Sequence, residues 1–403
     1  MKYVILVPDG MADYPIDSLD NRTPLEAAQT PNMDAMVREG ILGRVHTIPA
    51  GLAPASDVAN MSILGYDPLQ YYSGRGPLEA ANMNIALADD DIAFRCNLVT
   101  IGNDQMVDYS AGHISNKESE ALMRDLNKFF HDDDYHFYPG VSYRNLFVIT
   151  DKGRNLNALK CVAPHDILSQ KFNKHLPRGK NAEVIIDFMN RSHEFLSKHE
   201  INKVRLDLGE NPANMIWLWG QGKRLTMPTY KERFNKIGAV VSAVDLIKGI
   251  GKIAGLEVLS VPGATGYYDT DYQAKADYGI RALRNKDFVF VHVEAPDEAG
   301  HNGDLREKIT AIERFDAHIV GSFLKHFKKT KQEFRMLVLP DHATPLSVRT
   351  HTSDTVCFAL CGKDVVHNGF ESIGEQKAKE SNVFFPAGVA LIEQFFQEGT
   401  FGM

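Results

Sequence analysis

The chain has 403 residues, more than one ordinary hydrophobic core accommodates, so two or three compact units are expected. Hydrophobic residues at 44% and charged residues at 24% are typical of folded, water-soluble proteins and exclude disordered and fibrous classes. The formal net charge of -8, without a long run of one sign, argues against a nucleic-acid partner. An anionic substrate would need bound cations or a few convergent basic side chains.

The first predicted element is a buried strand at the N-terminus. Its apolar run, Tyr3 to Val7, is interrupted by Pro8 and Asp9 and is too short for a signal peptide or a membrane span. The four cysteines show no CxxC spacing, which fits a reducing compartment. A cytoplasmic protein without a membrane partner is therefore expected.

A helix is predicted to begin at Pro31, directly after Thr30, because proline is favoured at the first helical position. Apolar side chains then recur at helical spacing, and Gly40 is the expected stop. The apolar positions are Met33, Met36 and Val37.

Ser56 precedes a second helical stretch, in GLAPASDVANMSILGYDP. One interpretation is a helix N-cap, a position where serine is common. The other is a nucleophile, since a helix N-terminus stabilises the negative charge of phosphoryl oxygens, and a serine hydroxyl on a metal ion ionises near neutral pH. The two interpretations are compatible.

The middle of the chain has a different character. YHFYPGVSYRNLFVIT is strand-like, and a long helix is predicted near residues 181–199. We predict an inserted smaller α+β domain at 85–235, which would bind substrate. A discontinuous core domain would then consist of 1–84 and 236–403.

Two later strands repeat the pattern of the first, an apolar run followed by Pro and Asp. They are FVFVHVEAPD, ending at Asp297, and MLVLPD, ending at Asp341. Continuous apolar runs suit strands buried on both faces of a parallel sheet, and ligands bind at the carboxyl ends of such strands. Asp9, Asp297 and Asp341 are therefore expected to converge at one edge. The intervening segment predicts a helix whose apolar face carries Ile309, Ile312, Ile319, Val320 and Phe323.

Three histidines accompany these carboxylates, namely His301, His342 and His351. The spacing of Asp297 and His301 places both side chains on one face if the turn between them is helical. Each feature alone has an ordinary explanation, a turn or cap for the aspartates and a surface or core position for a histidine. Together they favour mixed carboxylate and imidazole ligation of two divalent ions such as Mn or Zn.

Several long motifs resemble those of the archaeal-type cofactor-independent (2,3-bisphosphoglycerate-independent) phosphoglycerate mutases of the alkaline phosphatase superfamily. The resemblance covers nearly the whole chain, and it rests on VPDGMAD, ASDVANMSILGYDP, GRGPLEAA, SAGHIS, PGATGYYDT, APDEAGHNGD, LPDH and RTHT. It implies an alkaline-phosphatase-like α/β fold, with a mostly parallel sheet that has helices on both faces. No 2,3-bisphosphoglycerate would be needed, and a homo-oligomer is compatible with the sequence.

The resemblance also implies roles for individual residues. One ion would be bound by Asp297, His301 and His351, and the other by Asp9, Asp341, His342 and Ser56. The ions would be Mn²⁺, with Zn²⁺, Mg²⁺ or Co²⁺ as alternatives. His113, Arg144 and Arg75 would contact a small anionic phosphometabolite, although each has an alternative as a solvent-facing or turn residue. A substrate-binding lysine is also expected, but Lys248, Lys252 and Lys275 are not distinguished, and His165 with Asp166 stays an unassigned polar pair.

The implied reaction interconverts 3-phosphoglycerate and 2-phosphoglycerate, a step of glycolysis and gluconeogenesis, through a phosphoserine at Ser56. A related metal-dependent phosphotransferase, such as a proposed homoserine kinase, is the alternative, because RTHTSD, PHDI and SAVDLIKGIGKIAGL also resemble that group. A phosphatase is a further alternative, since water admitted to the site would hydrolyse the phosphoserine. A non-catalytic binding module is disfavoured because every expected metal-binding position carries a competent ligand.

Overall fold

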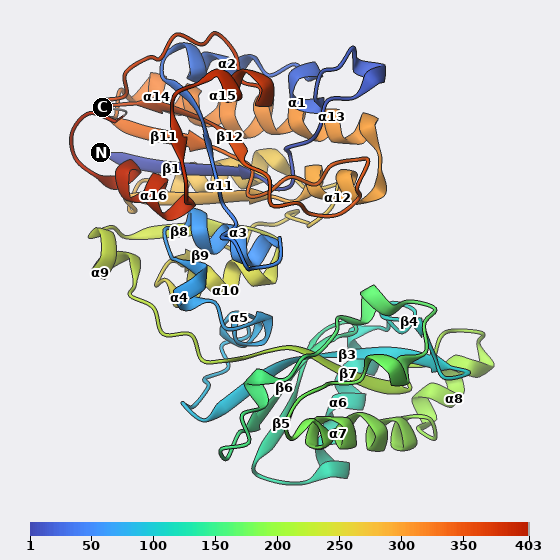
Figure 1. The fold of residues 1–403 in the computed structure, drawn as a ribbon. Coiled ribbons are helices and arrows are strands. Elements are labelled where there is room, and N and C mark those ends of the chain that lie inside the picture. Colours follow the sequence, from blue (N-terminus) through green and yellow to red (C-terminus); the bar gives the residue numbers. More distant parts are fainter. Residues whose placement is uncertain (402–403) are drawn as a thin grey trace. The chain divides into compact units, whose positions relative to one another are not determined.

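The structure is a computed structural model that describes residues 1–401 (Figure 1). The chain forms two compact units: unit 1 comprises Met1–Tyr72 and the chain from Thr226 onward, and unit 2 comprises Ser73–Leu225. The insertion expected at 85–235 differs from unit 2 at both ends, since residues 73–84 lie in unit 2 and residues 226–235 in unit 1. Among the described residues, no helix has the length and apolar character needed to cross a membrane.

Unit 1 is built on an eight-stranded sheet with the order β13-β2-β12-β11-β1-β10-β8-β9. Five of its seven strand pairs are parallel, and only the two pairs made by β12 with β11 and β2 are antiparallel. The predicted α/β class with a mostly parallel sheet is confirmed. The strands are β1 (Lys2–Pro8), β2 (Ile41–Val45), β8 (Gly238–Val241), β9 (Glu257–Val258), β10 (Phe288–Val293), β11 (Phe334–Val338), β12 (Val356–Gly362) and β13 (Phe384–Phe385).

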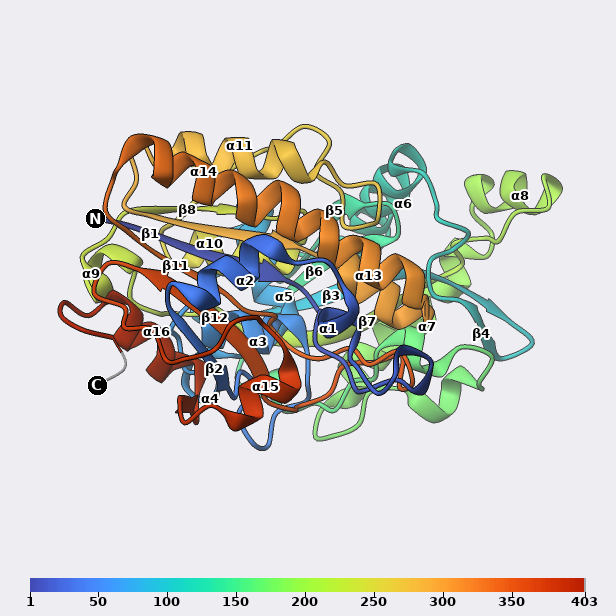
Figure 2. The same cartoon turned by 90° about the horizontal axis from the view of Figure 1, so that it is seen from above.

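Helices pack on both faces of this sheet (Figures 1 and 2). The long helices of unit 1 are α2 (Pro31–Arg38), α3 (Ser56–Ile63), α10 (Asp245–Ile253), α11 (Tyr272–Ala282), α12 (Ala295–Asn302), α13 (Leu305–Arg314), α14 (Gly321–Thr330) and α16 (Gly388–Phe396). Shorter ones are α1 (Pro24–Ala27), α4 (Pro68–Tyr71), α9 (Tyr230–Phe234) and α15 (Glu375–Glu380), with a 3₁₀ turn at Asp17–Leu19.

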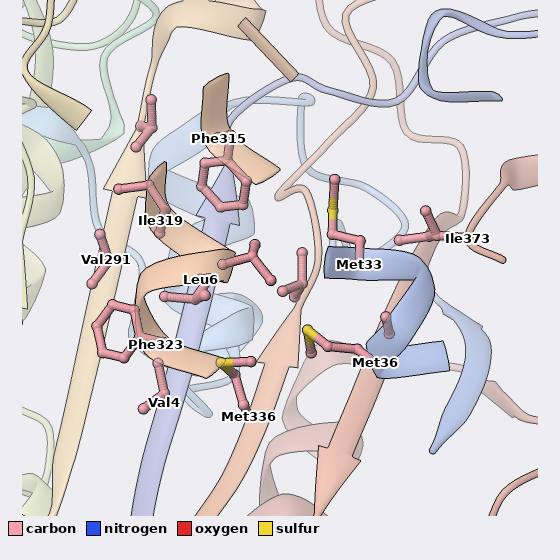
Figure 3. Close-up of a cluster of buried hydrophobic side chains, with 14 of the residues drawn as sticks. Val4, Leu6, Met33, Met36, Val291, Phe315, Ile319, Phe323, Met336 and Ile373 are labelled. Atoms are coloured by element: carbon pink, nitrogen blue, oxygen red, sulfur yellow. The ribbon is translucent and has the colours of Figure 1, made fainter. Parts of the chain in front are cut away.

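Strand β1 shows why its sequence is apolar without alternation. Val4 and Leu6 point into a cluster that contains Met33 of α2 and Phe323 of α14 (Figure 3). The ring of Tyr3 lies on the opposite side of the pleat, 5.5 Å from the ring of Phe395 in α16. Both faces of the strand are therefore buried, as expected for a central parallel strand.

Both helices expected from hydrophobic spacing are present. Helix α2 begins at Pro31 and buries Met33, Met36 and Val37, as predicted. The later helix continues from α13 into α14 through a π-helical segment, Phe315–Val320. Ile312 of α13, Ile319 and Val320 of the π-helical segment and Phe323 of α14 are all buried in the core, while Ile309 is only half-buried.

Unit 2 contains a five-stranded antiparallel sheet in which the long strand β3 pairs with β4, β6 and β7, and β5 pairs with β6. The strands are β3 (Asp91–Gly102), β4 (Gln105–Asp108), β5 (Tyr135–Val141), β6 (Arg144–Thr150) and β7 (Met215–Lys223). The helices are α5 (Arg75–Asn82), α6 (Asn116–Phe130), α7 (Ala182–Leu196) and α8 (Glu200–Asp207), with 3₁₀ turns at Leu156–Ala158, Pro164–Ile167 and Phe172–His175. The strand-like segment forms the β5–β6 hairpin, and the predicted long helix is α7.

Candidate active site

Three adjacent strands, β11, β1 and β10, run parallel, so their carboxyl ends meet at one edge of the sheet. Asp9 directly follows β1, and Asp341 lies three residues after β11. Asp297 is carried differently from the prediction. Strand β10 ends at Val293, and Asp297 lies in the first turn of α12. Helix α12 begins at Ala295 and has Pro296 in its first turn, a position that suits proline.

The first group of ligand-type side chains is Asp297, His301 and His351. Helix α12 places Asp297 and His301 four residues apart on one face, with 3.2 Å between Oδ2 and Nε2. His351 comes from the loop after β11, and its Nε2 lies 3.0 Å from His301 Nε2 and 3.5 Å from Asp297 Oδ1. The expected DxxxH pairing is therefore present in the geometry.

The second group surrounds Asp9, which is almost completely buried. Nε2 of His342 lies 3.3 Å from Asp9 Oδ1 and 3.5 Å from Asp341 Oδ2. His292, which interrupts the apolar run of β10, places its Nε2 3.1 Å from Asp9 Oδ2. Two sets of three converge here, Asp9 with His292 and Asp341, and Asp9 with Asp297 and His342.

Ser56 adjoins the second group from helix α3. Ala55 is the N-cap and Ser56 the first helical residue, so the N-cap interpretation of the serine is wrong. The N-cap side chain makes no capping hydrogen bond, while Ser56 Oγ lies 3.0 Å from His342 Nε2. The serine therefore sits at a helix N-terminus with its hydroxyl among the acid and histidine side chains.

The donor set fits divalent cations on two observations. Asp9 Oδ1 and His292 Nε2 are buried and have no hydrogen-bond partner within residues 1–401, although each lies within 3.3 Å of another ligand-type atom. Atoms that approach one another this closely without hydrogen bonds converge on a common point, as ligands around an ion do. In the same range, the ion pairs of the three carboxylates are with histidines alone. A cation would neutralise this charge.

Burial and the neighbouring carboxylates also shift the pKa values of these groups. Burial, together with the carboxylates of Asp341 and Asp297, raises the pKa of Asp9 well above its usual range. Burial lowers the pKa of His292 to about 4 and also lowers the pKa of His342. Both rings are therefore neutral at neutral pH, which is the state in which imidazole binds metals. The hydrogen bond to Asp297 raises the pKa of His301 to about 9.

Three side chains that the sequence interpretation missed support this cluster. His292 contacts Asp9, as described above. Asn60 of α3 donates to Asp341 Oδ2 at 2.7 Å. Thr344 donates to Asp297 Oδ1 and lies 3.2 Å from His342 Nδ1. Only His292 left a signal in the sequence, since a histidine inside a buried apolar strand needs a polar partner.

The predicted substrate residues Arg75, His113 and Arg144 all belong to unit 2. The guanidinium of Arg75 lies 5.6 Å from the centre of the Trp219 ring, and that of Arg144 lies 5.6 Å from the Tyr143 ring. The His113 ring lies 6.1 Å from the same Tyr143 ring. The guanidinium of Arg95 lies 4.6 Å from the same Trp219 ring and pairs with Glu79 at 2.8 Å. Burial lowers the pKa of Arg95, the Glu79 carboxylate opposes this shift, and the charges of Arg75 and Arg144 lower the pKa further.

The candidate lysines and His165 have different surroundings in the structure. Lys275 is completely buried in α11, and its Nζ lies 3.4 Å from the carbonyl oxygen of His292, whereas Lys248 pairs with Asp245 at 3.2 Å. In unit 2, the His165 ring lies 5.5 Å from the Trp219 ring, which the guanidinium of Arg75 also approaches.

Known proteins resemble this chain over nearly its full length. A family model described as 2,3-bisphosphoglycerate-independent phosphoglycerate mutase matches residues 37–202. The Methanosarcina acetivorans protein of that name is 51% identical over 385 residues, covering 95% of this chain and 96% of the relative. A Geobacter sulfurreducens protein, named a probable enzyme of this kind, is 46% identical and covers 98% of this chain and 99% of its own.

Solved structures agree with these relatives. A Pyrococcus horikoshii protein superposes with a TM-score of 0.83 at 29% identity, over 100% of this chain and 99% of its own. The cofactor-independent phosphoglycerate mutase from Thermoplasma acidophilum gives a TM-score of 0.67 at 26% identity, over 98% and 100% of the two chains.

The fold and the site define an α/β enzyme with an acid and histidine centre for divalent metal ions beside a serine at a helix N-terminus. Sequence identity near 50% over the full chain narrows this class to one family. The chain belongs to the 2,3-bisphosphoglycerate-independent phosphoglycerate mutases. The resemblance of its motifs to this family is confirmed.

Proposed function

We propose that this protein interconverts 3-phosphoglycerate and 2-phosphoglycerate through a phosphoserine at Ser56. The observation that carries the proposal is the position of Ser56 Oγ, 3.0 Å from His342 Nε2 at the N-terminus of α3. The relatives described above bear the mutase name, so the homoserine kinase and phosphatase alternatives are not favoured.

In the first half of the reaction, the Ser56 hydroxyl loses its proton and Oγ attacks the phosphorus of 3-phosphoglycerate, the bond from phosphorus to the substrate's 3-oxygen breaks, and that oxygen takes a proton. The 2-hydroxyl of the retained glycerate then loses its proton and attacks the phosphoserine. The bond to Ser56 Oγ breaks, the serine regains a proton, and 2-phosphoglycerate leaves. The backbone N–H groups at the start of α3 favour the negative charge of the phosphoryl oxygens in both halves.

We assign two divalent ions to the site, with Mn²⁺ as the first choice. Asp297, His301 and His351 would bind one ion, and Asp9, Asp341, His342 and Ser56 the other. His292 is an additional candidate because of its contact with Asp9. Ions bound there would neutralise the carboxylates and stabilise charge on the attacking and leaving oxygens.

Unit 2 would bind the glycerate part of the substrate. Arg75 and Arg144 offer planar groups that bind carboxylate or phosphate through two hydrogen bonds, and His113 offers a further donor. For the substrate lysine we choose Lys275, because it is buried beside the backbone of His292, and burial lowers its pKa to about 8.

The test is intact-protein mass spectrometry of the Mn-loaded protein after mixing with 3-phosphoglycerate alone. A phosphoryl group on Ser56, together with formation of 2-phosphoglycerate, is the expected result. Ser56→Ala should lose both signals and keep the fold, since Ser56 is the first residue of α3 and not its N-cap. Phosphorylation that needs ATP, with no conversion of phosphoglycerate, would favour the kinase instead.

A further inference from the structure

Asn60 links the candidate nucleophile to a candidate metal ligand. It lies on α3, four residues after Ser56, and its side chain is completely buried. Its amide nitrogen Nδ2 donates to the carbonyl oxygen of Ser56 at 2.8 Å and to Asp341 Oδ2 at 2.7 Å. One side chain therefore bridges the helix that carries the serine and the loop that carries the carboxylate.

The chemistry of the partners fixes the orientation of the amide. A carbonyl and a carboxylate oxygen only accept hydrogen bonds, so the NH₂ group must face both of them. The Oδ1 atom of Asn60 is then left buried with no hydrogen-bond partner within the described residues. Buried acceptors without partners are uncommon in folded proteins, so the two donated bonds outweigh an unsatisfied oxygen.

The bridge completes the set of hydrogen bonds that hold Asp341. Oδ1 of this carboxylate accepts the backbone N–H of Gly10 and of His342, at 3.1 Å and 2.9 Å. Asn60 holds the other oxygen, so backbone N–H groups orient one carboxylate oxygen and the Asn60 side chain orients the other. Loss of the bridge would remove the hydrogen bond that Asn60 donates to Oδ2 and with it the link from Asp341 to Ser56.

We propose that Asn60 is a positioning residue for phosphoryl transfer, which sets the placement of Ser56 relative to Asp341 without touching the substrate. The role rests on the proposed function. Groups that orient metal ligands typically change ion affinity or activity by about 10–100-fold when they are removed.

A simpler explanation is that Asn60 only satisfies a carbonyl of its own helix, as polar helical residues often do. Asn60→Ala and Asn60→Ser distinguish the two. A serine at this position still reaches the carbonyl four residues earlier but is too short to span to Asp341. If Asn60 positions the site, both variants bind Mn²⁺ about 10-fold or more weakly in calorimetry, and both lose kcat with little change in KM.

Asn202 provides the matched control. It is also completely buried, and its Nδ2 donates to the carbonyls of Leu196 and Ala213 at 2.8 Å and 2.9 Å, but it lies in unit 2 and contacts no candidate ligand. Asn202→Ala should lower the unfolding temperature and leave Mn²⁺ affinity unchanged.

Unchanged Mn²⁺ affinity in Asn60→Ala, or its full recovery in Asn60→Ser, would overturn the proposal. If Asn60→Ala does not fold, Asn60→Ser alone is the test: weaker Mn²⁺ binding supports the proposal, and parental Mn²⁺ affinity overturns it. The calorimetry needs no substrate, so an inactive parent enzyme would refute the proposed mutase reaction and leave the role of Asn60 to be judged by ion binding.

Discussion

Replacing Lys308 by Met should destabilise unit 1 more than any surface change. Lys308 of α13 is completely buried, and its ammonium donates to Asp13 Oδ2 at 2.7 Å, to the Thr344 carbonyl at 2.8 Å and to the Ala12 carbonyl at 3.4 Å. Methionine has a similar shape but no donor. It would leave the Asp13 carboxylate buried without its cation, which typically costs about 3–5 kcal/mol. For a domain of this size that corresponds to a fall of roughly 10 °C in melting temperature.

Calorimetry measures the transition, and fluorescence helps to locate it. Both tryptophans, Trp217 and Trp219, belong to unit 2, so their emission follows that unit alone. The double variant Lys308→Met with Asp13→Asn removes the unpaired charge, and we expect it to recover at least about 1 kcal/mol relative to the sum of the single effects. A single variant that loses less than about 1 kcal/mol, or strictly additive effects, would refute the reasoning.

Three other changes follow from the structure. Asp341→Asn keeps the shape of the ligand but removes its charge, so Mn²⁺ affinity and activity should fall together; calorimetry with unchanged affinity would exclude Asp341 as a ligand. Arg144→Ala should raise KM for 3-phosphoglycerate by roughly 10-fold or more, since a charge-assisted contact contributes about 1.5–3 kcal/mol, whereas Arg124→Ala, a surface control in the same unit, should not. Burial raises the pKa of Glu375 from 4.5 to about 7. Because this pKa is higher in the folded state, the folded protein loses stability as the pH rises from 4.5 to about 7 and the buried carboxyl ionises. Glu375→Gln cannot ionise, so in urea titrations it should be more stable than the parent at pH 8, by on the order of 1 kcal/mol, and equally stable at pH 4.

The strands and helices that carry the site could be predicted because neighbouring residues in each of these segments favour the same secondary structure. The apolar run before Asp9 is uninterrupted, and the proline that follows it ends the strand. The prediction failed for Asp297, because Pro296 can either end a strand or open a helix, and the segment between β10 and α12 is only one residue long. Local sequence does not decide between these two outcomes.

Contacts between distant segments could not be predicted from local patterns. Asn60 and Asp341 are separated by 281 positions, and nothing in the sequence near Asn60 distinguishes it from an ordinary helical asparagine. The π-helical segment at Phe315–Val320 was also hidden, because one extra residue in a turn shifts the apolar spacing by less than the scatter of a normal amphipathic helix.

The charge of the site imposes an order on binding. Asp9, Asp297 and Asp341 lie together. Burial has lowered the pKa of His292 and His342, so these two rings supply no positive charge at neutral pH, whereas His301, whose hydrogen bond to Asp297 raises its pKa to about 9, stays protonated. A phosphate ester that approached these carboxylates alone would be repelled at short range and low dielectric. Divalent cations bound by these carboxylates would reduce the negative charge near Ser56, so under the proposed mechanism they would bind before the phosphoryl group arrives. The hydrogen bonds from Asn60 and Thr344 would then have a purpose before any substrate is present, because they hold Asp341 and Asp297 in place for the ions.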